Sequence, residues 1–421
     1  MSVTIKQEIY TIIETGNVEQ ALDLLAAYAK SNDHEQIFEA AELYHELGHV
    51  DKAQPLIELL MGLYPEEGSL LVMAAELMID ADQEDDAIEY LLDVRVDDPS
   101  FLQAQLLLAD LYQLQALDEV AEQKLLAAAK QAPDELIITY ALGEFYLDQG
   151  EYNKAIPYLK QALHADLGEV NVGLALAEAY SANGQFEDAL SLYHQQKNSE
   201  LSPNHLFNFG FTAFQQKDYT VAIEQLETVK TLDADFTSVY VPLARAYEAE
   251  NRLDEALETL TTGMRMDEFN DALPLLAGKL LLKMQDPTGA EQYLRQAIAL
   301  NPANVEALQT LSAFLKQNER AVELDDLINH AKEFGETDSL LTWYQAYAKA
   351  DMEQYNEARI LYEEAYLTLQ EDSEFLSEYG QFMLEEGDRK KALVLIKKAY
   401  QLDPSNGELI ELIEELQNDS F

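Results

Sequence analysis

The feature of this 421-residue sequence that most restricts its fold is a column of alanines that recurs about every 34 residues. The column consists of Ala21, Ala53, Ala87, Ala121, Ala155, Ala189, Ala222, Ala256, Ala290, Ala358 and Ala392. It has one double-length gap, and Leu324 stands at the vacant position. Self-similarity at a fixed period is the signature of stacked units, so the chain is predicted to consist of about twelve like repeats.

Three further columns keep the register of the alanines and place the helices of each repeat. A small residue such as Gly143 or Ala177 stands twelve residues before the alanine, glycine often stands five before it, and proline often stands twelve after it. Glycine permits a turn at the end of a helix, whereas proline cannot continue one. Small residues also allow two helices to cross closely. Each repeat is therefore predicted to be two helices joined by a short turn.

One repeat shows a resemblance to a known family. Its segments Leu142–Tyr146 and Gly150–Ala155, followed by Ala162, resemble the tetratricopeptide repeat (TPR) almost position for position. The resemblance covers nearly the whole chain, although repeats 1 and 10 are degenerate, and extends to uncharacterised cytoplasmic TPR proteins of Bacillus-type bacteria. It implies an all-α fold, a right-handed TPR superhelix (α-solenoid) of about twelve helix-turn-helix repeats plus a C-terminal capping helix.

The sequence also indicates how the solenoid is divided. Repeats 1–6 are expected over residues 2–202, repeats 7–12 over 203–406, and the capping helix over 407–421. The connector at 196–203 is polar and one residue shorter than the period, so we expect a hinge there. The acidic helix after Pro404 would supply the polar end that a solenoid needs to remain soluble.

Composition excludes several classes of function. The chain has 27 Lys+Arg against 79 Asp+Glu, a formal net charge of -52, which argues against binding to nucleic acid or an anionic membrane surface. Cysteine is absent, so disulfides and thiolate metal sites are excluded. Because the sequence shows neither a secretory signal nor an apolar run long enough to span a bilayer, the protein is expected to be cytoplasmic.

One motif resembles a catalytic metal site. His45, Glu46 and His49 match H-E-x-x-H, in which two histidines on one helix face bind zinc and the glutamate acts as a base. In the repeat register Gly48 is the turn glycine, so His49 is expected beyond the end of the helix and away from the face of His45. A metal-dependent hydrolase at these residues is kept as an alternative, and no cofactor is expected.

The resemblance implies where a partner would bind. In TPR proteins, repeat positions 2, 5, 9, 12 and 13 line a concave groove, in a numbering that puts the column alanine at position 20. Here position 5 is mostly apolar, and position 9 is acidic in five successive repeats before it becomes aromatic and then basic. The predicted groove residues are Phe38, Glu42, Val72, Glu76, Leu106, Asp110, Tyr140, Glu144, Leu174, Glu178, Phe207, Phe211, Arg245, Lys279, Lys283, Lys316, Trp343 and Tyr347. The alternative is that position 5 belongs partly to the core and that the acids serve only solubility.

These observations predict a non-catalytic protein–protein interaction scaffold or adaptor. A peptide segment or helix of a protein partner, with basic and apolar residues, would lie in the concave groove. A third interpretation is an acidic structural protein that assembles only with itself. The sequence makes no prediction of oligomeric state.

The connector generates the first test. Limited proteolysis of the whole protein is expected to cut within 196–203 before it cuts within repeats 3–5, because a polar connector opens more easily than a packed hairpin. Mass spectrometry of the first fragments identifies the site. A first cut inside repeats 3–5 would contradict the hinge.

Overall fold

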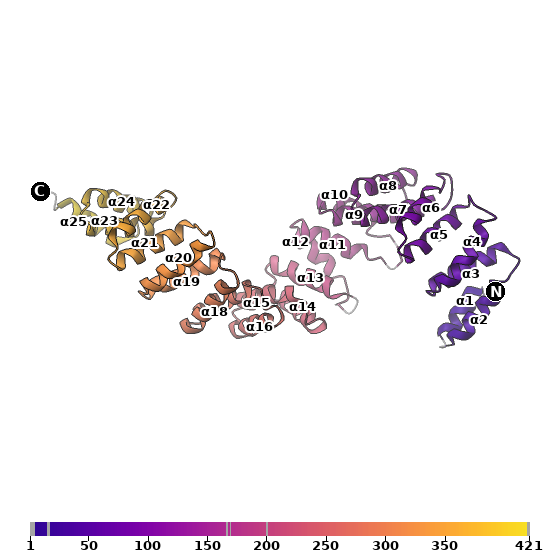
Figure 1. Cartoon of the computed structure of the whole chain (residues 1–421), viewed down its shortest axis with the longest axis horizontal. Coiled ribbons are helices and arrows are strands. Elements are labelled where there is room, and N and C mark those ends of the chain that lie inside the picture. The colour runs from indigo at the N-terminus through magenta and orange to yellow at the C-terminus, as the bar shows by residue number, and fades with distance from the viewer. Residues whose placement is uncertain (1–4, 15–16, 166, 169, 199–200, 419–421) are drawn as a thin grey trace. The chain divides into compact units, whose positions relative to one another are not determined.

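The computed structural model describes residues 5–14, 17–165, 167–168, 170–198 and 201–418, and their regular structure is entirely helical. The chain divides into an N-terminal unit, Met1–Lys197, and a C-terminal unit, Asn198–Phe421. Within each unit, successive helices pack as antiparallel hairpins (Figure 1). The predicted hinge overlaps this division but includes Ser199 and Glu200, which lie outside the described residues, so it stays a prediction.

The N-terminal unit holds six hairpins. Their helices are α1 (Ile5–Glu14), α2 (Val18–Tyr28), α3 (His34–Glu46), α4 (Val50–Met61), α5 (Gly68–Asp80), α6 (Glu84–Leu92), α7 (Phe101–Leu114), α8 (Asp118–Gln131), α9 (Leu136–Asp148), α10 (Tyr152–Ala162), α11 (Val172–Ala182) and α12 (Phe186–Tyr193). Each odd-numbered helix is the first helix of a repeat, and each even-numbered helix is the second.

The C-terminal unit holds six more hairpins and a final helix. Its elements are α13 (Pro203–Gln215), α14 (Tyr219–Leu232), η2 (Thr237–Val239), α15 (Tyr240–Ala249), α16 (Leu253–Met266), α17 (Ala272–Lys283), α18 (Pro287–Leu300), α19 (Val305–Gln317), α20 (Ala321–Glu333), α21 (Ser339–Asp351), α22 (Tyr355–Tyr366), α23 (Ser373–Glu385), α24 (Arg389–Leu402) and α25 (Gly407–Asn418). The predicted hairpins and capping helix are thus confirmed.

The small-residue columns mark the closest contact inside each hairpin. Every alanine of the column is at most 1% exposed. Opposite it, a Cβ atom added to Gly143 would lie 2.6 Å from Cδ2 of Leu159, and one added to Gly278 would lie 2.7 Å from Cγ of Leu294. Such separations leave no room for a side chain, so the two helices approach this closely only because these positions are small.

The turn inside each hairpin requires a left-handed backbone. In repeats 2–12 the residue five before the alanine column has φ between 56° and 85°, while Gly16 of repeat 1 lies outside the described residues. Glycine fills this position at Gly48, Gly150, Gly184 and Gly387, where the sequence predicted a turn. The other seven repeats place an ordinary residue there, which costs roughly 1–2 kcal/mol each.

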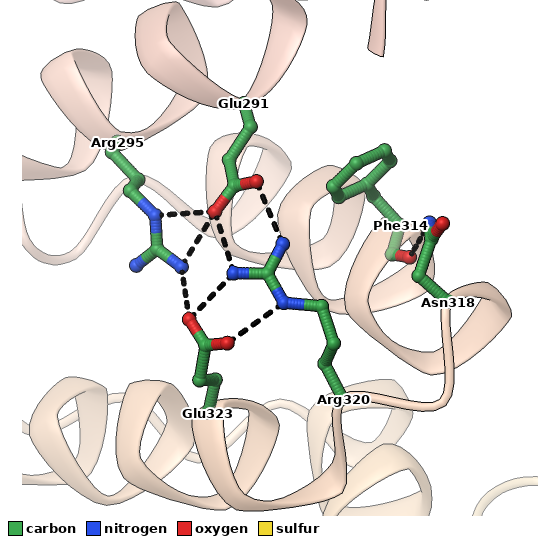
Figure 2. A network of polar contacts seen from close by, with 6 residues as sticks. All are labelled: Glu291, Arg295, Phe314, Asn318, Arg320 and Glu323. Carbon is green, nitrogen blue, oxygen red and sulfur yellow. Dashed lines mark hydrogen bonds and ion pairs between the residues drawn. The ribbon is translucent and has the colours of Figure 1, made fainter. Parts of the chain in front are cut away.

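Repeat 10, which has Leu324 in place of the column alanine, is bound to repeat 9 by a ring of four charges (Figure 2). Arg320 bonds Glu291 through both terminal nitrogens, at 2.7 and 3.0 Å, and also bonds Glu323. Arg295 contacts the same two carboxylates at 2.8 and 3.0 Å. These bonds hold the pKa values of Glu291 and Glu323 below their usual range.

A second polar network joins repeat 10 to repeat 11. Asp325 on α20 is 8% exposed and forms an ion pair with Lys349 on α21 at 2.9 Å. The buried Gln345 donates to Asp325 and to Asn329, both at 2.8 Å. Buried polar groups are tolerated when they are satisfied in this way. The degenerate repeat is therefore held to both neighbours by polar contacts as well as by apolar packing.

The close crossing in repeat 5 generates a stability prediction. Replacing Ala155, which is fully buried between α9 and α10, by leucine is expected to lower the free energy of unfolding by about 1–3 kcal/mol through overpacking. Urea titration of the full chain measures the change. The matched control is Gln161→Leu, which adds the same side chain at an exposed position of α10. Equal midpoints for the Ala155 variant and the wild type would contradict the assigned crossing.

Candidate partner-binding site

The first helices of repeats 2–6 each carry an acid at the same position. These residues, here called the acidic ladder, are Glu42, Glu76, Asp110, Glu144 and Glu178 on α3, α5, α7, α9 and α11. Each lies four residues after the position-5 residue of its repeat, so the two share one helix face. The hairpin packing therefore repeats the same acid from one helix to the next along the N-terminal unit.

Burial divides the position-5 residues of this unit into two groups. Val72 and Leu174 are 3% and 7% exposed and belong to the core, as the alternative interpretation of this column requires. Phe38, Leu106 and Tyr140 are half-buried and leave apolar surface beside the acids. The column is therefore an interrupted apolar stripe and not a continuous one.

Three rungs of the ladder are partly removed from water. Burial raises the pKa of the Glu76 and Glu144 carboxyls above their usual range and also raises that of the more exposed Asp110. At Glu144, a hydrogen bond from the Tyr140 hydroxyl opposes this shift, whereas the charges of Asp148 and Glu178 add to it. A raised carboxyl pKa means that the folded protein disfavours the ionised form.

These three carboxylates have little positive charge near them. Among the described residues, no lysine or arginine forms an ion pair with Glu76, Asp110 or Glu144. Glu76 accepts a hydrogen bond from Gln103 at 2.9 Å and is also stabilised by His45, which itself bonds Asp80 at 2.8 Å. The middle of the ladder thus consists of two half-buried carboxylates and the exposed Asp110, and none of the three is paired with a lysine or arginine of the described chain.

The predicted cations of the C-terminal unit differ, because most are neutralised within the chain. Lys279 bonds Glu306 at 2.5 Å, and Lys283 bonds Glu248 at 3.3 Å. Arg245 is exposed and forms no ion pair with a described residue.

Lys316 is held in a cage of this unit's own side chains. Its ammonium bonds Glu378 at 2.5 Å and lies 4.3 Å from the ring centroid of Trp343, and 5.2 Å from those of Tyr344 and Tyr347. The Trp343 indole nitrogen also donates to Glu378, at 2.7 Å, and Trp343 is only 3% exposed. This cation already has its partners, and the tryptophan is mostly core.

Three aromatic residues of repeat 7 lie together. The rings of Phe207 and Phe211 are stacked with centroids 6.1 Å apart, and Phe236 lies 5.1 Å from Phe207. Phe211 is 38% exposed, so this cluster presents apolar surface.

Two further residues belong to these sites and were not predicted. Asp148, whose pKa is raised by burial, stands at repeat position 13 of the implied groove, so the resemblance contained a signal for it. Glu378 stands next to position 5 of its repeat and became evident only from its contacts with Lys316 and Trp343.

Family models match much of the chain. The model described as YpiA-like, tetratricopeptide repeats matches residues 113–167, its C-terminal counterpart matches 340–406, and general TPR models match 146–201, 213–278 and 275–304. The TPR repeat-containing protein YpiA of Bacillus subtilis (strain 168) is 43% identical over 418 residues, covering 99% of each chain. The chain belongs to the YpiA-like family of TPR proteins.

Two solved structures also resemble it. The crystal structure of YrrB, a TPR protein with an unusual peptide-binding site, is 16% identical and covers 44% of this chain and 96% of its own, with a TM-score of 0.40. The Cut9–Hcn1 hetero-tetramer structure is 12% identical and covers 98% and 95%, with a TM-score of 0.42. TPR proteins generally serve as non-catalytic protein-interaction scaffolds.

The H-E-x-x-H residues of this YpiA-like chain do not converge. α3 ends at Glu46, Gly48 has φ of 74°, and His49 stands at the start of α4, as the repeat register predicted. His45 bonds Asp80, whereas the His49 ring packs edge-on against Tyr44. Over the described part of the chain there is no cluster of three metal-ligating side chains, and no helix is long and apolar enough to cross a bilayer.

The raised pKa values generate a prediction on stability. The triple variant Glu76→Gln, Asp110→Asn, Glu144→Gln is expected to unfold at a higher temperature than the wild type at pH 7, because it removes charges that folding partly desolvates. With the folded pKa above the unfolded one, the penalty is complete above the folded pKa and disappears as pH falls below the unfolded pKa. The gain should therefore shrink toward pH 4.

A matched control separates this effect from bulk charge. Glu58, Glu89 and Glu187 are exposed on the second helices α4, α6 and α12, and changing all three to glutamine alters net charge equally. Thermal unfolding followed by circular dichroism compares the two triple variants. If the control gains as much at pH 7, general repulsion explains the result and desolvation of the ladder does not.

Proposed function

We propose that this protein is a scaffold whose N-terminal unit binds a basic segment of a protein partner along the acidic ladder, and that it does so in the cytoplasm. The observation that carries the proposal is the row of carboxylates at Glu76, Asp110 and Glu144, of which Glu76 and Glu144 are half-buried, with no lysine or arginine of the described chain paired to them. A partner that supplies cations would offset the cost of removing these carboxylates partly from water without a basic partner.

The repeat geometry supports a lengthwise mode of binding. Because the ladder residues occupy one position of successive hairpins, a segment lying across the first helices would meet an acid at each repeat. Their fields add along the row and would accelerate association with a cationic segment. A single exposed pair contributes only about 0–1 kcal/mol, so affinity would come from several rungs together.

The half-buried apolar residues add a second element of recognition. Phe38, Leu106 and Tyr140 lie one helical turn before a ladder acid on α3, α7 and α9. Apolar side chains of the partner would cover them, so the favoured segment combines basic with apolar residues.

The C-terminal unit is less suited to binding an acidic segment through its lysines. Lys279, Lys283 and Lys316 are already paired with Glu306, Glu248 and Glu378, and an acidic segment would have to displace these contacts. The proposal therefore places primary recognition on the N-terminal unit.

Charge reversal tests the proposal. The probe is a fluorescein-labelled peptide of alternating lysine and serine, and its binding to the full-length protein is followed by fluorescence anisotropy at low and physiological salt. Reversing Glu76, Asp110 and Glu144 to lysine is expected to abolish binding while the helical circular dichroism stays unchanged.

The control reverses Glu58, Glu89 and Glu187 to lysine, which alters net charge by the same amount on the second helices. Glu58 accepts a hydrogen bond only from Gln54 on its own helix, at 2.9 Å, whereas Glu122 accepts one at 2.6 Å from the buried Tyr146 of another helix and is therefore unsuitable as a control. The control variant should retain binding. Equal loss in both variants would mean that bulk acidity attracts the probe, and retention in both would place binding on another surface.

Sedimentation of the unliganded protein at two concentrations tests the self-assembly alternative.

A further inference from the structure

A small pocket opens at the first rung of the acidic ladder. Its volume is about 240 Å³, and it is lined by His34, Glu35, Phe38, Leu60, Tyr64, Glu67, Ser69 and Leu70. Phe38 is four residues before Glu42 on α3, so the pocket and the ladder share a face of that helix. None of these lining residues was recognised from the sequence except Phe38.

The floor of the pocket is apolar and fixed. Leu60 and Leu70 are 2% and 4% exposed, and both belong to the core shared by repeats 1 to 3. The wall formed by the start of α5 is anchored by the loop between α6 and α7, because Asp98 in that loop accepts a 3.1 Å hydrogen bond from the Gly68 nitrogen. A Cβ atom on Gly68 would lie 2.2 Å from Oδ1 of Asp98, so this anchorage requires glycine.

The mouth of the pocket is polar and acidic. Nδ1 of His34 lies 2.9 Å from the Tyr64 hydroxyl, and the two rings meet edge to face at 5.6 Å between centroids. Glu35 and Glu67 are both exposed at the rim, and no lysine or arginine of the described chain forms an ion pair with either. The site therefore combines an apolar interior with a negatively charged entrance.

The size of the pocket limits what it holds. Sites for drug-sized molecules typically measure about 300–1,000 Å³, so this one is better matched to a single large side chain. An apolar side chain would bury against Leu60 and Leu70, and a lysine or arginine next to it in sequence would face Glu35 and Glu67. An acidic neighbour would be repelled by the same rim.

We propose that this pocket anchors the partner segment through one large apolar side chain, of leucine or phenylalanine size, that is flanked by basic residues. The anchor fixes the register of the segment, while the ladder attracts its remaining basic residues. This inference rests on the proposed function of the ladder, and the test separates the two.

The test compares a leucine-free peptide with three leucine-bearing peptides on the full-length protein by fluorescence anisotropy. The leucine-free peptide is the alternating lysine–serine probe, and each of the others carries leucine in place of one serine, near one end, near the other end or at the centre. Burial of a leucine side chain is expected to tighten binding about tenfold for at least one placement. The variant Ser69→Leu, which fills the pocket from its wall, should remove this gain and bind the leucine-free probe as the wild type does.

Further variants keep the test decisive. Tyr64→Ala opens the wall at a residue that is 45% exposed and should also remove the gain, whereas Ser69→Ala and the distant exposed Ser191→Leu should preserve it. A wild type that binds all of these peptides equally, or a gain that survives in both Ser69→Leu and Tyr64→Ala, would overturn the pocket while leaving the ladder intact. Failure of the leucine-free probe to bind the wild type would overturn the proposed function itself.

Discussion

The close crossing of two helices at small residues is the contact on which the rest of this molecule depends. Ala155 and Gly143 illustrate it, since the Leu159 side chain fills the space that a Cβ atom of Gly143 would need. Because the same crossing recurs in hairpin after hairpin, equivalent residues are carried to equivalent places. A polar column on the first helices thereby becomes a row on the surface. The regular spacing of the acidic ladder is thus a consequence of core packing.

The two units handle charge in different ways. In the C-terminal unit, Lys279, Lys283 and Lys316 are bound by acids of the same unit, and Arg320 and Arg295 neutralise Glu291 and Glu323. In the N-terminal unit, Glu76, Asp110 and Glu144 are partly desolvated without such partners. Charges that are partly removed from water without a partner lower the stability of the folded protein. Groups with pKa values perturbed in this way cluster at functional sites.

Repeat 10 shows how a departure from the repeat pattern is accommodated. Leu324 replaces the column alanine and is fully buried, so this hairpin lacks the small residue that defines the others. Two polar networks attach it, the ring around Arg320 to repeat 9 and the Asp325–Lys349 pair to repeat 11. Both use charged side chains brought together from different helices, and neither follows a sequence period.

The sequence by itself determined the hairpins, their number and their register, because close packing restricts residue size at fixed intervals and leaves a periodic record. It also marked position 9 as a row of acids. Only the tertiary structure decided what depends on neighbours from other repeats. It placed Val72 and Leu174 in the core, paired Lys316 with Glu378, and assembled the pocket that Phe38 lines from three helices and a loop. Burial, ion pairing and cavity shape each depend on several segments of the chain at once. The residue pattern of a repeat, in contrast, is contained within a single segment.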